Sequence, residues 1–115
     1  MSLTKRKGEL VSDWDTRLDG EMTLAAVRNK YKPSASYRIS KKKIPASDSY
    51  AGVTRAAVCH ILRGQCRIAV GGNAIVGARA GQFVSIIDGS YRIDAFPGED
   101  VEMVWVWELP EEFRK

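Results

Sequence analysis

The sequence predicts a mainly-β domain, folded as a sandwich or barrel of short strands. Between Ser36 and Leu109, short apolar or alternating runs are separated by turn residues at nearly regular intervals, which is typical of sandwiches and barrels. Three glycines, Gly64, Gly81 and Gly89, mark the main turns between these runs. A chain of 115 residues with 44% hydrophobic residues has room for one core and no second.

The N-terminal third has a different pattern, which predicts an arm followed by one helix. Residues 1–12 are largely polar or charged and predict an arm without regular structure. A helix is expected over residues 21–31, where the apolar spacing is partly helical and contains neither Pro nor Gly. Asp19 or Gly20 would cap its start, and Pro33 would end it. A helix this short is marginal alone, so we expect it to pack against the rest of the domain.

From residue 36 onward the apolar period becomes that of strands. The expected strands are residues 37–41, 53–62, 66–70, 74–76, 83–87, 91–95 and 101–109. The last of them places Trp105 and Trp107 on one face and Val104 and Val106 on the other. Two large aromatic residues on one face either fill the core or form an exposed patch that binds a partner.

Composition narrows the functional classes. The net charge of +4 comes largely from the clusters at residues 5–7 and 41–43. We expect these lysines and arginines to keep the surface solvated, and nucleic acid is not an expected partner because no aromatic stacking pattern accompanies them. No apolar run has the length of a membrane span, and no secretory signal is recognisable. A cytoplasmic location is therefore expected, with Cys59 and Cys66 as reduced core residues.

The glycine spacing resembles that of the cupin family. The family's first motif, G-x5-H-x-H-x3-4-E-x6-G, ends in a glycine that matches Gly64. Its second motif, G-x5-P-x-G-x2-H-x3-N, has two glycines that match Gly81 and Gly89. The resemblance covers residues 36–109 and implies an all-β fold, a cupin-like jelly-roll β-barrel with one short N-terminal α-helix.

The resemblance also implies a division of the single domain into segments. An arm and short helix occupy residues 1–35, the cupin-like β-barrel occupies residues 36–110, and a polar tail occupies residues 111–115.

The metal-binding positions of the two motifs carry no metal-binding side chains. The histidine and glutamate positions of the first motif fall on Tyr50, Gly52 and Ala57, and the histidine of the second falls on Arg92. A divalent metal in this fold needs imidazole and carboxylate ligands. We therefore expect no metal and no cofactor.

Arg92 is the leading candidate for ligand binding. If it points into the barrel as the family's histidine does, its permanent charge needs an acidic partner or an anionic ligand there. Asp94 has the same strand parity and is the alternative, internal partner. The candidate residues of a barrel pocket are Arg92, Tyr50, Tyr91, Cys59 and Arg55.

His60 is the only histidine of the chain. Strand alternation points it away from Cys59, so no Cys–His dyad is expected. If Cys59 faces the barrel, His60 faces outward as a packed or interface residue.

These expectations favour a metal-free, cupin-like binding or interaction protein with a small anionic ligand over an enzyme. Cupins often dimerise through a sheet face or an N-terminal strand, so the resemblance implies a homodimer. Two alternatives stay open. One is a metal-independent isomerase or lyase that binds its substrate through Arg92 and uses Tyr50 or Tyr91 for acid–base work. The other is a regulatory or nucleic-acid-associated protein.

Overall fold

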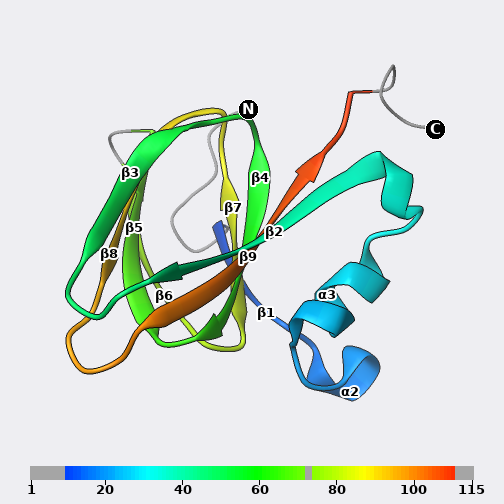
Figure 1. The fold of residues 1–115 in the computed structure, drawn as a ribbon, viewed down its shortest axis with the longest axis horizontal. Coiled ribbons are helices and arrows are strands. Elements are labelled where there is room, and N and C mark those ends of the chain that lie inside the picture. The colour runs from blue at the N-terminus through cyan, green and yellow to red at the C-terminus, as the bar shows by residue number, and fades with distance from the viewer. Residues whose placement is uncertain (1–9, 72–73, 111–115) are drawn as a thin grey trace, which may run out of the picture.

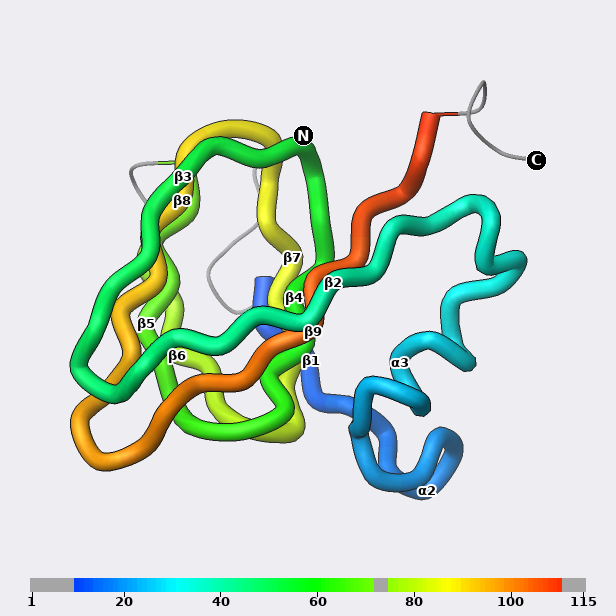
Figure 2. The backbone as a smooth tube through the Cα atoms, in the orientation of Figure 1, coloured from blue at the N-terminus to red at the C-terminus, as the bar shows by residue number. Residues whose placement is uncertain are grey.

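The computed structural model describes residues 10–71 and 74–110, which form two facing antiparallel β-sheets (Figures 1 and 2). One sheet has the strand order β1-β7-β4-β9-β2, and the other has the order β3-β8-β5-β6. The strands are β1 Val11–Asp13, β2 Tyr37–Ile44, β3 Ser49–Thr54, β4 Ala57–Arg63, β5 Gln65–Val70, β6 Ala74–Arg79, β7 Gln82–Ile86, β8 Gly89–Ala95 and β9 Val101–Glu108. The predicted all-β jelly roll is confirmed.

The core lies between the sheets, and strand alternation fills it. On β8, Tyr91, Ile93 and Ala95 are buried in the core, whereas Arg92 and Asp94 lie on the outer face. Successive side chains of a strand point to opposite faces, so an alternating sequence such as that of β8 has one apolar face and one polar face.

Glycines make the turns that join the strands. Gly64 has φ 84°, and a Cβ there would lie 2.5 Å from the carbonyl oxygen of Asp100. Both the backbone conformation and the close approach therefore require glycine. Gly81 and Gly89, with φ of 93° and 132°, confirm that the matched glycines serve the backbone.

Part of the outer face of the five-stranded sheet is covered by the segment of residues 14–31, which we call the cap. It contains two short helices, α2 Thr16–Asp19 and α3 Leu24–Lys30, which Figure 1 shows outside the barrel. Val27 on α3 is completely buried and belongs to one apolar cluster with Val104 and Val106 of β9. The predicted packing of this helix against the barrel is confirmed.

The start of the helix differs from the prediction. Helix α3 begins at Leu24, and its N-cap is Thr23, whose hydroxyl accepts a hydrogen bond from the Ala26 N–H at 3.1 Å. The predicted cap at Asp19 or Gly20 is wrong, because Gly20, at φ 72°, instead ends α2.

The N-terminal segment also contributes a strand that the sequence analysis assigned to the arm. Strand β1 pairs with β7, with Val11 opposite Val84. A single-turn 3₁₀ helix, Ser34–Ser36, leads into β2. The rest of the predicted arm, residues 1–9, and the polar tail, residues 111–115, lie outside the described residues. Within the described ranges, no helix has the length and apolar character needed to cross a membrane.

Candidate functional site

A hollow of about 220 Å³ opens between β2 and β3, the strands at neighbouring edges of the two sheets. We call it the mouth. Its lining residues are Lys42, Lys43, Ile44, Tyr50, Ile93, Met103 and Trp105.

The pairing of β2 with β9 points one lysine inward. Lys42 lies opposite Met103 of the core, so its side chain belongs to the inner face of the sheet. Its neighbours Lys41 and Lys43 lie on the outer face, where they form ion pairs with Glu102 at 3.1 Å and with Asp100 at 3.3 Å. Of these three consecutive lysines, Lys42 alone lies on the inner face of the sheet, although Lys43 also borders the mouth.

Aromatic groups surround the Lys42 ammonium. Its Nζ donates a hydrogen bond to the Tyr50 hydroxyl at 3.3 Å and lies 4.6 Å from the centre of the Tyr50 ring. The same nitrogen is 5.4 Å from the centre of the Trp105 ring. Aromatic faces attract a cation but do not neutralise it. Among the described residues, no carboxylate forms an ion pair with Lys42.

Two tyrosines with opposite pKa shifts meet beside this ammonium. The hydrogen bond from Lys42 lowers the pKa of Tyr50. Burial, and then the interaction with Tyr50, raise the pKa of Tyr91 to about 12. The two rings stack with centroids 6.0 Å apart. Gly52 makes room for them, since a Cβ there would lie 3.1 Å from the Tyr91 hydroxyl.

Sulfur and indole groups form the inner wall of the mouth. The Met103 sulfur accepts hydrogen bonds from the Trp105 indole N–H at 3.1 Å and from the Cys59 thiol at 3.5 Å. Burial raises the pKa of Cys59 well above its usual range and that of Cys66 to about 12. Both cysteines are free and buried. They are therefore neutral core thiols, not nucleophiles.

The aromatic wall continues along β9 beyond the mouth. Trp105 and Trp107 stack with centroids 5.6 Å apart, and the Trp107 indole donates to the Thr54 hydroxyl at 2.9 Å. The Arg38 guanidinium lies 5.7 Å from the Trp107 ring centre. Both tryptophans pack against the barrel core, so the core interpretation of this pair is confirmed.

The structure brings together three of the predicted pocket residues, Tyr50, Tyr91 and Cys59. It does not bring Arg92 to them, and the prediction that Arg92 points into the barrel is wrong. Its side chain is 62% exposed on the outer face of β8, where Nε donates to Asp94 Oδ1 at 2.9 Å. Counting from the motif reached the right strand, but alternation turns Tyr91 inward and Arg92 outward. Asp94 is indeed its partner, although on the surface.

Arg55 belongs to a different hollow. It follows β3 and borders an open groove of about 780 Å³ on the outer side of the five-stranded sheet, beyond the cap. Val58, Ile87 and Val106 contribute apolar side chains to this groove, and Tyr31 of the cap borders it.

Sequence reasoning missed Lys42, Met103 and Trp105 as residues of the site. The available signal for Lys42 was strand alternation. Ile44 is apolar and lies two residues from Lys42, so the two side chains share one face of the strand. The same strand also carries apolar residues at the opposite parity, Tyr37 and Ile39, which pack under the cap. Both parities were therefore plausible for β2.

The motif positions do not fit the divalent metal of the resembled family. Tyr50 and Gly52 lie on the inner face of β3, Ala57 lies in the core, and Arg92 lies outside. None of these side chains offers an imidazole or a carboxylate. Within residues 10–71 and 74–110, no group of three or more His, Cys, Asp or Glu residues comes together in a way that could hold a metal ion.

Comparison with known proteins identifies the fold through structure and not through sequence. No family model matches the sequence, and no curated protein matches it. Among solved structures, the cupin domain of Schizosaccharomyces pombe Cnp3 matches with a TM-score of 0.59 and 14% identity, over 70% of this chain and 61% of that one. The plu4264 protein of Photorhabdus luminescens matches with a TM-score of 0.61 and 10% identity, over 72% of each chain.

A third match is an enzyme. The Lactobacillus farciminis oxalate decarboxylase, in a formate complex, matches with a TM-score of 0.59 and 13% identity, over 87% of this chain but 28% of that one. At these identities the likeness concerns the fold, and this chain spans only part of the Cnp3 and decarboxylase chains. The chain has the jelly-roll fold of the cupin superfamily.

Proposed function

We propose that this protein is a metal-free, cupin-like binding protein that takes a small organic anion at the mouth. One observation carries the proposal: Lys42 points inward from an edge strand and, among the described residues, has aromatic and hydroxyl neighbours but no carboxylate. A partly buried ammonium is stabilised by a counter-charge, and a ligand carboxylate would supply it.

The size and walls of the mouth narrow the ligand class. A volume of about 220 Å³ is below the usual range for drug-sized ligands, roughly 300–1,000 Å³. Tyr50 and Trp105 present aromatic surface beside the ammonium. A carboxylate with a small flat body, such as benzoate, suits both features. The formate complex of the structurally similar decarboxylase supports a small carboxylate as the class.

The test is ligand-dependent stabilisation. Benzoate at ten times its Kd should add about 1.4 kcal/mol to the free energy of unfolding and raise Tm by about 5 °C. Lys42→Met should abolish the response. Lys41→Met, one residue away on the outer face, is the matched control and should keep it. The proposal is wrong if acetate, benzoate and phosphate all leave the wild-type Tm unchanged, or if Lys42→Met responds as the wild type does.

A second candidate function is a metal-independent isomerase or lyase acting at the same mouth. It is favoured by the two tyrosines, because the pKa of Tyr50 is lowered and that of Tyr91 is raised to about 12. Two titratable groups whose pKa values are shifted apart can act as base and acid. Pyruvate is a suitable probe. Tyr50-dependent exchange of its methyl protons in D₂O, followed by NMR and lost in Tyr50→Phe, would support catalysis. Binding of pyruvate without proton exchange would contradict catalysis and support binding as the only function of the mouth.

We also propose that two copies of the chain associate through the groove. Val58 and Ile87 extend the apolar outer face of the five-stranded sheet beyond the cap, and Ile87 is 45% exposed. Light scattering should give twice the mass of the chain, and Ile87→Asp should halve that mass. A monomer at high protein concentration would contradict the proposal.

The role of the surface lysines and the cellular location also belong to the proposal. The pairing of Lys41 and Lys43 with surface acids supports a solvating role for these lysines over a nucleic-acid interface. The buried free thiols Cys59 and Cys66 suit a reducing compartment such as the cytoplasm.

A further inference from the structure

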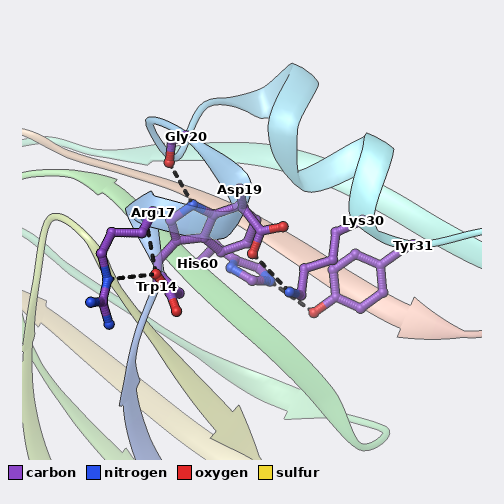
Figure 3. A network of polar contacts seen from close by, with 8 residues as sticks. Trp14, Arg17, Asp19, Gly20, Lys30, Tyr31 and His60 are labelled. Carbon is purple, nitrogen blue, oxygen red and sulfur yellow. Dashed lines mark hydrogen bonds and ion pairs between the residues drawn. The ribbon is translucent and has the colours of Figure 1, made fainter.

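His60 lies in an aromatic box beneath the cap. It stands on the outer face of β4 and is 1% exposed. The edges of Trp14 and Tyr31 approach its ring, with centroids 5.5 and 5.7 Å away, and the tilted ring of Phe83 lies at 5.2 Å. Figure 3 shows Trp14 and Tyr31, from the two ends of the cap, on either side of His60.

Only one nitrogen of this buried ring has a partner. His60 Nε2 and the Tyr31 hydroxyl form a hydrogen bond of 2.9 Å, whereas Nδ1 is buried without a partner among the described residues. If the tyrosine donates, Nδ1 carries a proton with no acceptor. If Nε2 donates, Nδ1 is an acceptor with no donor. Either neutral form is tolerated, but the protonated ring would bury a charge and an unpaired N–H together.

The groups around the box do not offer a counter-charge. The cap contributes Lys30, which is paired with Asp19 at 3.0 Å, and Asp15, which accepts a hydrogen bond from the Arg17 backbone. The strands on either side of β4 contribute the apolar side chains of Phe83 and Val104, both opposite His60. From β2, the Tyr37 ring packs on Tyr31. Burial, and then the Lys30 charge, lower the pKa of His60 to about 4.

The cap is the part of the box with the least regular structure of its own. Its helices have four and seven residues, too few to be stable in water on their own. It belongs to an apolar cluster on the outer face, separate from the cluster between the sheets. Detachment of the cap would therefore leave the cluster between the sheets intact, and it would release His60 into water.

We propose that the cap is an acid-released cover over the outer face of the five-stranded sheet, and that protonation of His60 releases it. Detachment uncovers Phe83, Val104 and Val106, an apolar surface that continues into the groove.

The experiment is hydrogen exchange of backbone amides at two pH values, corrected for the intrinsic pH dependence of exchange. With a pKa of about 4 when covered and its ordinary value of 6.5 when released, linkage predicts an opening equilibrium roughly 70-fold larger at pH 4.5 than at pH 7.5. The Val27 amide, bonded to the Thr23 carbonyl, should lose protection by that factor. The amides that pair β5 with β8 open only when the barrel unfolds, so at both pH values they should stay much better protected than the Val27 amide.

Variants separate His60 from the acidic residues of the cap. In His60→Leu, α3 should be equally protected at both pH values, whereas Asp19→Asn should open as the wild type does. Because His60 is the only histidine, NMR of its ring in the unmodified chain gives a second readout, which should show protonation at the pH where α3 opens. The proposal is overturned if His60→Leu opens like the wild type, if the amides of β5 and β8 are no better protected than those of α3, or if the ring titrates while α3 stays protected.

Discussion

The outer faces of the two sheets differ in what covers them. On the five-stranded sheet, His60, Val104 and Val106 point outward yet are at most 3% exposed, because the cap lies over them. On the four-stranded sheet, Val53 is 81% exposed, and Arg92 and Asp94 form a surface ion pair. Under the cap, the five-stranded sheet is buried on both faces, whereas the four-stranded sheet is buried on one. Strand β9 is accordingly apolar at every residue from 103 to 106, and β8 alternates.

Among the changes that test this difference, removal of the cap should have the largest effect on stability. Deletion of residues 1–32 would expose the apolar outer face of the five-stranded sheet and should lower the free energy of unfolding by several kcal/mol, measured by urea denaturation. An unchanged melting curve would mean that the cap does not stabilise the barrel.

The pH dependence of stability should come next in size. The folded-state pKa of His60, about 4, lies below its ordinary value of 6.5, so the unfolded chain takes up the proton first as the pH falls. The stability that depends on a neutral His60 is complete above pH 6.5 and is lost toward pH 4, by up to about 3 kcal/mol. His60→Leu should flatten this part of the curve in denaturant titrations. A slope that persists in this variant would assign the loss to carboxylates.

Two valines on opposite sheets provide a matched comparison. Val104 is fully buried under the cap and Val53 is 81% exposed. Val104→Ala should cost about 2 kcal/mol, whereas Val53→Ala should change stability by less than about 0.5 kcal/mol. Equal effects in thermal and urea unfolding would show that the two faces do not differ as described.

The smallest effect is expected at Arg92. Its ion pair with Asp94 is solvent-exposed, so Arg92→Ala should shift stability by no more than about 0.5 kcal/mol. It should also leave the response to benzoate intact. Loss of the benzoate response in this variant would return Arg92 to the binding site.

Features set by local sequence could be predicted, and features set by the long-range packing of the cap could not. The turn glycines and the short strands were sufficient for the jelly roll, because local backbone geometry determines both. Arg92 was misplaced because motif counting was given more weight than alternation, although β8 alternates cleanly between Tyr91, Ile93 and Ala95 inside and polar residues outside.

Lys42 could not be assigned in this way. Strand β2 carries Tyr37 and Ile39 at one parity and Ile44 at the other, and all three pack against apolar neighbours. Which parity faces the barrel depends on the cap, a long-range contact that local pattern does not report. His60 depends on the same long-range contact. Strand alternation predicts that it faces outward as a packed or interface residue, but the local pattern does not report that Trp14 and Tyr31 cover it.

Methionine methyl NMR tests the proposed anion site most directly, because it reads both regions in one spectrum. Met103 borders the mouth, and Met22 belongs to the cap, buried in its apolar cluster. Titration with benzoate should shift the Met103 methyl signal to saturation and leave the Met22 signal in place, and Lys42→Met should remove the shift. An unmoved Met103 signal, or a shift of Met22 alone, would contradict anion binding at the mouth.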